Sequence, residues 1–395
     1  MSLETKIREA FERHANDAQA RSDVWPGVER RIRRSHRIRV AGSGLAAAAV
    51  IAAIAVAVPR LTTQRTLPPI DQPTSAPTDV PVLAAKIPVN AISLAAGEGS
   101  LWALQSAGEP DFPGTLKRID PSTNRTIGTM HVGINPMVVA TGEGSVWVLN
   151  GDVCRGPECP ADQREPEAGQ ALTLWRIDPR SMKVTDTIPL GGSDFVVDSG
   201  FGWATAYGGL SRVDLDPNVV EPVQPWGSIA GGGGARLAIG GGFAWVATEH
   251  AELEGNGYLN IVDLARRELS EVRDISSAST VPDVTFGFGS AWVTTGTESS
   301  ASGLARYDAT SRQIVATITL PDAAPVGLTS VTTGYGYVWA TSARGYLWKV
   351  DPNTNTAPID PILIGDAPPA YANAVVTGFG SVWVSGEGQI WRFQP

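Results

Sequence analysis

The chain repeats one six-residue motif, Gly-x-Gly-x-x-Trp, at nearly regular intervals. Six copies keep both glycines and the tryptophan, at 97–102, 142–147, 240–245, 287–292, 334–339 and 378–383. A seventh copy, 198–203, keeps Gly200 and Trp203 but has Asp198 at the first position. Successive tryptophans are 45, 56, 42, 47, 47 and 44 residues apart. This period is typical of β-propellers, in which each repeat is one four-stranded sheet.

Each repeat contains four short apolar runs, which in the second repeat lie at 136–140, 146–149, 174–178 and 187–190. Apolar and polar residues alternate in these runs, as expected of β-strands. The third run opens with an aliphatic residue in every repeat: Leu116, Leu174, Leu210, Leu259, Leu304, Leu347 and Ile390. The sequence therefore predicts an all-β fold.

The glycines are expected to form the tight turn between the first and second strands, where positive φ is needed. They are not a nucleotide loop, because a strand rather than a helix follows each copy. The tetraglycine 231–234 is likewise not followed by Gly-Lys-Ser/Thr. Asp120 and Asp351, each before a proline, are expected to cap backbone amides in the turn between the third and fourth strands.

The last repeat ends at Pro395, directly after its third run, and lacks a fourth strand. Residues 82–89 supply a candidate, because Lys-Ile-Pro-Val at 86–89 resembles Thr-Ile-Pro-Leu at 187–190. Pairing this segment with the last repeat would close the ring and remove exposed edges. We therefore predict that residues 82–395 form a seven-bladed β-propeller.

The first 39 residues differ in character from the rest. They carry ten Lys and Arg against six acidic residues, with six arginines between 30 and 39. Leu3, Ile7 and Phe11 recur at helical spacing, which predicts a short amphipathic helix. Residues 40–58 contain no charge, and nineteen residues at ~1.5 Å rise span roughly a bilayer core. Because the arginines precede this segment, the positive-inside rule places the N-terminus in the cytoplasm.

The same pattern has a second interpretation, a cleaved signal peptide, since Ala55-Val56-Ala57 has the Ala-x-Ala form. Its charged leader would be unusually long, so we favour an uncleaved transmembrane helix. Residues 59–81 are rich in Pro, Thr and Ser and predict an extended stalk. The expected organisation is a cytoplasmic basic segment (1–39), one transmembrane helix (40–58), a stalk (59–81) and an extracytoplasmic propeller (82–395).

Charge excludes one class of partner. Of the total net charge of −9, residues 1–39 contribute +4, so the remainder carries −13. Nucleic acid binding needs a basic face for phosphate contacts. The propeller is therefore not expected to bind nucleic acid.

The motif and the residues after it, G-x-G-S-V-W-V … L-W-R-I-D-P-x-T-N, resemble the bacterial YVTN and virginiamycin B lyase-like propellers. The resemblance covers 82–395 and implies a seven-bladed propeller. That superfamily includes a lyase that uses a metal with a histidine and acidic residues, and neither His131 nor His250 matches a complete set of this kind. The basic segment, anchor and stalk resemble membrane-bound bacterial regulators, including anti-sigma proteins. Residues 1–59 contain no cysteine and therefore lack the His-x3-Cys-x2-Cys zinc motif of one such class.

Two variable loops are candidate binding elements, because variable loops on a rigid scaffold commonly carry sites. The longest, 150–173, contains Cys154 and Cys159, which we expect to form a disulfide outside the membrane, with zinc as an alternative. The loop in the fourth repeat carries Glu249 and His250 beside further acids. His250 is either a metal ligand or general base, or simply solvated.

A third candidate lies four residues before each motif. The residues there are Ser93, Val138, Asp194, Arg236, Asp283, Ser330 and Ala374, which we name the mouth residues. They should gather at one mouth of the central channel. Asp194, Arg236 and Asp283, in consecutive repeats, either tie the ring by ion pairs or bind a ligand.

These features favour a membrane-anchored sensor or scaffold that binds a protein or glycan ligand at its loop face. The alternatives are a propeller enzyme, either a lyase or a lactone hydrolase, and an anti-sigma-like regulator with a cytoplasmic partner at residues 1–39. No catalytic residue or cofactor can be assigned from the residues.

Overall fold

The computed structural model describes the chain from residue 80 to residue 395. It leaves out 1–79 and the internal segments 107–112, 152–172, 207–208, 217, 225–228, 232–233, 250–255, 277–280, 297–301, 321–326 and 366–371. The expected amphipathic helix, transmembrane helix and most of the stalk lie outside the described residues. Between 80 and 395, no helix of the described segments is long and apolar enough to cross a membrane.

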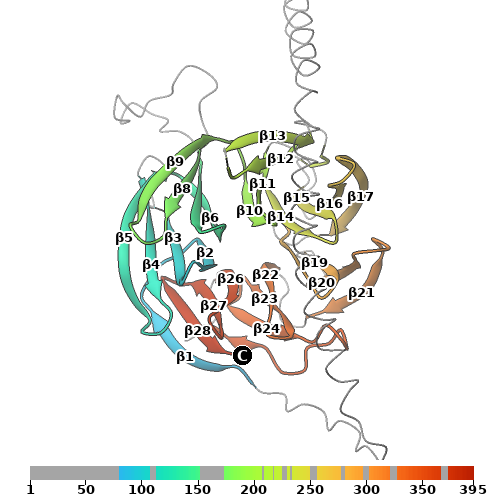
Figure 1. Ribbon diagram of the computed structural model, residues 1–395. Coiled ribbons are helices and arrows are strands. Elements are labelled where there is room, and N and C mark those ends of the chain that lie inside the picture. The colour runs from blue at the N-terminus through green and yellow to red at the C-terminus, as the bar shows by residue number, and fades with distance from the viewer. Residues whose placement is uncertain are drawn as a thin grey trace, which may run out of the picture. The chain divides into compact units, whose positions relative to one another are not determined.

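The described strands form seven antiparallel sheets of four strands each, arranged as blades around a ring (Figure 1). Blade 1 contains β2 (Ser93–Gly97), β3 (Ser100–Gln105), β4 (Pro113–Asp120) and β5 (Arg125–Ile134). Blade 2 contains β6 (Pro136–Gly142), β7 (Ser145–Asn150), β8 (Thr173–Asp178) and β9 (Lys183–Pro189). Blade 3 contains β10 (Asp194–Asp198), β11 (Phe201–Ala206), β12 (Gly209–Asp214) and β13 (Val219–Gln224).

Blade 4 contains β14 (Ala235–Gly240), β15 (Phe243–Glu249), β16 (Asn256–Asp263) and β17 (Glu268–Ser276). Blade 5 contains β18 (Val284–Gly287), β19 (Ser290–Thr295), β20 (Gly303–Asp308) and β21 (Ile314–Thr319). Blade 6 contains β22 (Leu328–Gly334), β23 (Tyr337–Ser342), β24 (Tyr346–Val350) and β25 (Ile362–Leu363). Blade 7 contains β26 (Ala372–Gly378), β27 (Ser381–Gly386), β28 (Gln389–Gln394) and, as its outer strand, β1 (Val82–Ile87).

Blade 7 confirms the expected ring closure. β1 runs antiparallel to β28, with Val82 opposite Gln394 and Ile87 opposite Ile390. Ile87 is buried, as are Val89 and Ala91 just after it, in a cluster shared with blade 1. The N-terminal strand therefore completes the C-terminal blade and joins it to the first.

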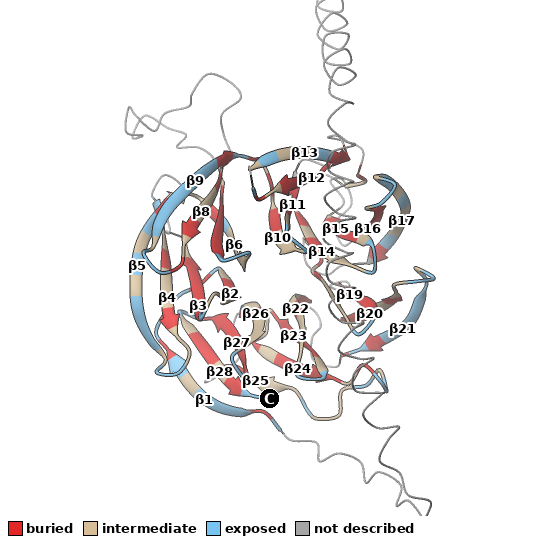
Figure 2. Ribbon diagram, in the orientation of Figure 1, coloured by how far each residue is buried: buried red, intermediate tan, exposed pale blue. Residues whose placement is uncertain are grey.

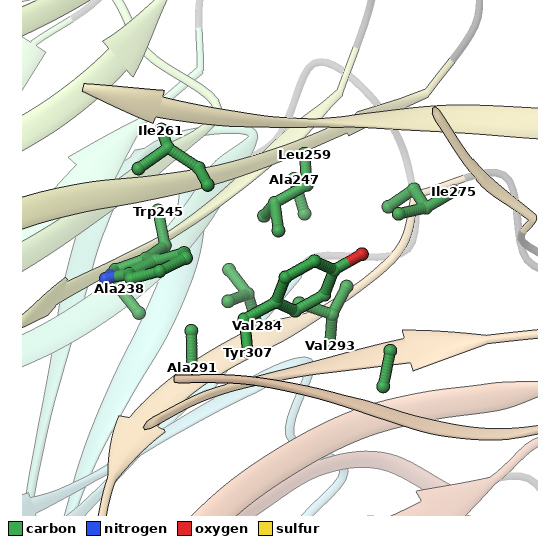
Figure 3. Packing of buried hydrophobic residues seen from close by; sticks show 11 residues of the cluster. Ala238, Trp245, Ala247, Leu259, Ile261, Ile275, Val284, Ala291, Val293 and Tyr307 are labelled. Carbon is green, nitrogen blue, oxygen red and sulfur yellow. The ribbon is translucent and has the colours of Figure 1, made fainter. Parts of the chain in front are cut away.

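The core lies between the blades rather than within one of them. Buried clusters fill the seven junctions between adjacent blades. Burial is greatest in the second strand of each blade, and the outer strands are largely exposed (Figure 2). At the junction of blades 4 and 5, Trp245 packs against Tyr307, with ring centroids 6.4 Å apart (Figure 3). The Trp245 ring also packs against that of Phe286, at a centroid distance of 6.5 Å. The aliphatic residue that opens each third strand is fully buried in all seven blades. The repeated hydrophobic positions therefore hold neighbouring blades together.

The motif turns have positive φ at the middle residue and the second glycine, as at Glu143 (52°) and Gly144 (70°). The glycine at the first motif position does not need positive φ in five of the six complete copies, since only Gly142 has one. The expectation that a positive φ explains this glycine was therefore wrong in those five. These glycines instead allow close approach of the next blade, because a Cβ at Gly97 would collide with Thr141. The carbonyl of the first residue also accepts the Nε1 of the motif tryptophan in the six complete copies. In blade 3, where Asp198 replaces the glycine, Trp203 Nε1 has no partner among the described residues.

A second set of contacts ties the turn of one blade to the third strand of its neighbour. Arg306 of β20 lies over Trp292, 4.8 Å from the ring centroid, and donates Nε to Ser290 Oγ at 2.9 Å. Its other nitrogen donates to Pro352 O at 2.5 Å and to Asn355 Oδ1 at 2.9 Å in blade 6. The expected aspartate caps are also confirmed, since Asp120 and Asp351 each accept a backbone amide two residues on. The charged residues of the repeat thus serve the scaffold.

Candidate functional site

All seven mouth residues line one cavity of about 360 Å³. Six of them lie in innermost strands, at or near the strand's start, and Asp283 directly precedes β18. Because these strands begin at the same end of the ring, the mouth residues lie at the end opposite the Gly-x-Gly turns. The four-residue offset from the motif therefore brings residues from all seven blades to one place.

Four mouth residues accept a backbone N–H from the next blade. Ser93 Oγ accepts from Val139 N at 3.2 Å, and Ser330 Oγ from Val375 N at 3.4 Å. Asp194 Oδ2 accepts from Leu237 N at 2.8 Å, and Asp283 Oδ2 from Val331 N at 2.8 Å. In each pair the donor directly follows the mouth residue of its own blade. These positions thus form one recurring contact between adjacent blades.

The two aspartates have a second task that the serines do not. Asp194 Oδ1 accepts the N–H of Phe195 at 2.9 Å, and Asp283 Oδ1 that of Val284 at 2.9 Å. In four other blades, the amide that follows the mouth residue donates instead to the mouth residue of the preceding blade. The blades before Asp194 and Asp283 instead present Val138 and Arg236, which have no acceptor there. Each aspartate therefore serves its own amide and that of the following blade.

Burial acts on both carboxyl groups. Asp194 is 8% exposed, and desolvation raises its pKa to about 6, although Arg236 and the Leu237 amide favour the charged form and act against this. Desolvation also raises the pKa of Asp283, again opposed by Arg236. The negative charge of Asp283 also makes ionisation of Asp194 harder, whereas the nearby guanidinium makes ionisation of both easier. The cavity wall thus contains two acids that ionise less readily than ordinary aspartates.

Arg236 stands between the two aspartates in the order of blades, yet it forms no ion pair with either. Its one hydrogen bond within the described residues is from a terminal nitrogen to Ala235 O, at 3.3 Å. The proposed Asp–Arg–Asp ion-pair tie is therefore wrong in its geometry, because both carboxylates turn toward backbone amides instead. Arg236 acts on them only through its charge. Arg236 is half-buried and lines the cavity, and most of its donors have no hydrogen-bond partner among the described residues.

Among the further lining residues that sequence reasoning missed are Ile92, Met137, Thr329 and Asn373. Each directly precedes a mouth residue, so the same offset increased by one would have found them. Ile92 and Met137 are 37% and 38% exposed and form part of an apolar rim with Val138 and Val376. The charged residues come from blades 3, 4 and 5. The cavity therefore has a charged side and an apolar side.

The other candidate residues lie elsewhere or outside the described segments. Glu249 ends β15 and accepts the N–H of Gly234 through Oε1 at 2.9 Å, so it stabilises the chain leading into β14. His250, Cys154 and Cys159 belong to segments that the structure does not describe. Within the segments that are described, no group of three or more His, Cys, Asp or Glu side chains is placed to hold a metal ion.

Comparisons with known proteins support the fold alone. No protein-family model matches the chain, and no curated protein matches it. Among solved structures, it is similar to a chain of hydrazine synthase from Kuenenia stuttgartiensis, with a TM-score of 0.60 and 12% sequence identity. The likeness covers 78% of this chain and 96% of that chain. At this identity the similarity extends to the architecture and not to the activity.

Proposed function

We propose that the protein is a binding module whose ligand site is the cavity lined by the mouth residues. The observation that carries this proposal is Arg236. At the same position two blades have serines and two have aspartates that join neighbouring blades, whereas Arg236 removes such an acceptor and gains no ion pair with a described residue. A partly buried guanidinium whose N–H donors mostly lack partners in the protein is well placed to meet a ligand.

The cavity suits a small molecule in size and lining. Its volume of about 360 Å³ lies within the range of ligand sites, roughly 300–1,000 Å³. Such sites are mostly apolar with a few polar groups that fix orientation. Arg236, Asp194 and Asp283 are polar groups of this kind, beside the apolar rim.

A fragment screen by ligand-observed NMR on the full-length chain in detergent tests this proposal. Met137→Trp fills the cavity from its rim, and Val315→Trp adds the same side chain on β21, where Val315 is 53% exposed. Some fragments should bind the native chain and Val315→Trp but not Met137→Trp. If no fragment separates the two variants, the cavity is not a binding site.

We further propose that the propeller lies outside the cytoplasm, anchored by residues 40–58, and that it is a distant relative of the YVTN and virginiamycin B lyase-like propellers. The arginines at 30–39 and the uncharged run after them support the anchor. A reporter enzyme fused after Pro395 should be active only outside the cytoplasm. Activity inside would reverse the orientation.

An enzyme of the lyase or lactone-hydrolase type is a second candidate, favoured by the buried Asp194 with its pKa of about 6. A carboxyl group that titrates near neutrality in a cavity is suited to general acid–base catalysis. Both of its oxygens already accept backbone amides, which weighs against this role. Turnover of a lactone panel by the native chain and its loss in Asp194→Asn would decide for the enzyme.

A further inference from the structure

We infer that the cavity binds a small monocarboxylic acid that carries a hydrogen-bond donor on the carbon next to its carboxylate. This inference rests on the proposed function and names the ligand class of the same site. Such compounds are 2-hydroxy acids and 2-amino acids. Arg236, the two aspartates and the apolar rim each specify one part of such a ligand.

Arg236 defines the first contact. A guanidinium has five N–H donors, and in the structure one nitrogen of Arg236 bonds to Ala235 O. The remaining donors form a planar fork that matches the two oxygens of a carboxylate or phosphate. The ligand should therefore present an oxyanion to Arg236.

The aspartates select among oxyanions. Asp194 and Asp283 both line the cavity and both interact electrostatically with Arg236. A phosphate with two negative charges would meet two carboxyl groups and one guanidinium. A carboxylate brings only one negative charge, so the two aspartates repel it less than they repel a phosphate. The charge around the cavity therefore favours a monocarboxylate.

The aspartates also favour a ligand that carries a hydrogen-bond donor. Each of their oxygens accepts one backbone amide, and a carboxylate oxygen has room for a second donor. Asp283 also interacts with the Ser330 side chain, so Asp194 is the freer acceptor of the two. A ligand whose carboxylate lies on Arg236 places its adjacent carbon near these neighbours. A hydroxyl or ammonium group on that carbon would donate a hydrogen bond to an aspartate. A ligand with a bare methylene group there would gain no such bond, and its carboxylate would still be repelled by the aspartates.

The apolar rim provides the third contact. Met137, Val138 and Val376 give the cavity an apolar side, which suits a hydrocarbon substituent on the acid. Four probes that share a phenyl group test each of the three contacts. They are mandelate with a hydroxyl, phenylglycine with an ammonium group, phenylacetate with neither, and mandelamide, which lacks the negative charge.

The experiment measures the binding of these probes to the full-length chain in detergent by isothermal titration or NMR line broadening. We expect mandelate or phenylglycine to bind with a Kd of the order of millimolar. Mandelamide should bind at least about tenfold more weakly, because it cannot form the charged fork with Arg236. Phenylacetate should bind severalfold more weakly than the better of the two acids with a donor.

Arg236→Ser separates binding from folding. It places at this position the residue found at Ser93 and Ser330, whose hydroxyls accept amides of the next blade, so the variant should still fold cooperatively. Its melting temperature should fall somewhat near neutral pH, because the Arg236 charge no longer favours the charged forms of Asp194 and Asp283. It should lose the preference for mandelate over mandelamide. Arg125→Ser removes an exposed arginine of β5 and should bind all four probes as the native chain does.

Three results would overturn the inference. The first is that mandelamide binds as tightly as mandelate, and the second is that Arg125→Ser loses as much affinity as Arg236→Ser. The third is that neither mandelate nor phenylglycine binds even when its concentration is 20-fold above ~1 mM. If the fragment screen finds other cavity ligands at the same time, the ligand class is wrong and the binding site stands.

Discussion

Arg392 in the last strand of the chain donates to the carbonyl of Pro121 in blade 1, at 2.6 Å. The same guanidinium donates to Asn124 Oδ1 at 3.0 Å and to Ser381 Oγ at 2.8 Å, and it lies 4.9 Å from the centroid of Trp383. This contact crosses the point where the two ends of the propeller meet. It repeats what Arg306 does between blades 5 and 6.

Replacing Arg392 with lysine tests what this contact contributes. Arg392→Lys keeps the charge but not the fork of donors, so it cannot bond to Ser381, Pro121 and Asn124 together. We expect a loss of about 1–3 kcal/mol in the free energy of unfolding, measured by urea denaturation. Arg306→Lys should lose a similar amount, and Arg125→Lys on the exposed outer strand should lose none. An Arg392→Lys variant as stable as the native chain would show that the contact is incidental.

Deleting β1 tests the closure of the ring. A chain of residues 81–395 should fold and melt cooperatively, because it keeps all four strands of blade 7. A chain of residues 93–395 loses β1 together with buried Ile87, Val89 and Ala91. Burial of an aliphatic side chain contributes about 1.5–3 kcal/mol, so the shorter chain should lose several kcal/mol. Equal melting temperatures by circular dichroism would mean that β1 does not close the ring.

The repeat made the architecture predictable from sequence because each fixed residue has a local task in every blade. The motif tryptophan, the aliphatic residue of the third strand and the capping Asp120 needed no knowledge of neighbours. The offset of four residues likewise brought Arg236 and Asp194 to one cavity, because equivalent positions of equivalent strands meet at one end of a propeller.

What sequence could not give depends on contacts between blades. Arg236 lies between Asp194 and Asp283 in the order of blades, which invites an ion pair, yet only the structure shows that the carboxylates face amides. The role of Gly97 was missed for the same reason, since it depends on how closely Thr141 of the next blade approaches. Arg236 therefore emerged as the distinctive residue only once its neighbours' bonds were known.

Replacing the middle residue of a motif turn with glycine should stabilise the fold where the native side chain makes no hydrogen bond. Glu143 is exposed and has a φ of 52°, a conformation that is unfavourable for residues with a Cβ. Glu143→Gly should raise the free energy of unfolding by about 0.5 kcal/mol, because relief of this strain outweighs the entropy that glycine adds to the unfolded chain.

Glu98→Gly is the matched control. Glu98 has nearly the same φ of 50° but also accepts the N–H of Gly144 through Oε1 at 3.2 Å. Glu98→Gly should therefore raise the free energy of unfolding by less than Glu143→Gly does, or lower it. If urea denaturation shows Glu143→Gly to be the less stable of the two, backbone strain does not govern these turns.

The raised pKa of Asp194 predicts how stability depends on pH. In the unfolded chain an aspartate has a pKa of about 3.9, and in the folded protein burial raises it to about 6. Between these values the folded state binds more protons than the unfolded state, so the contribution of Asp194 to stability falls as pH rises from about 4 to about 6. Relative to Asp194→Asn, which does not titrate, the native chain should lose on the order of 2–3 kcal/mol of unfolding free energy between pH 4 and pH 7.

Asp308→Asn is the control and should show the opposite sign. Hydrogen bonds from Ser311 lower the pKa of Asp308, so the native chain gains stability relative to that variant as pH rises. Urea denaturation of the native chain and Asp194→Asn at pH 4, 5, 6 and 7 gives the first difference, and measurements of the native chain and Asp308→Asn extended below pH 4 give the second, because a lowered pKa acts mainly there. A difference for Asp194→Asn that stays constant from pH 4 to pH 7 would show that Asp194 is ionised throughout.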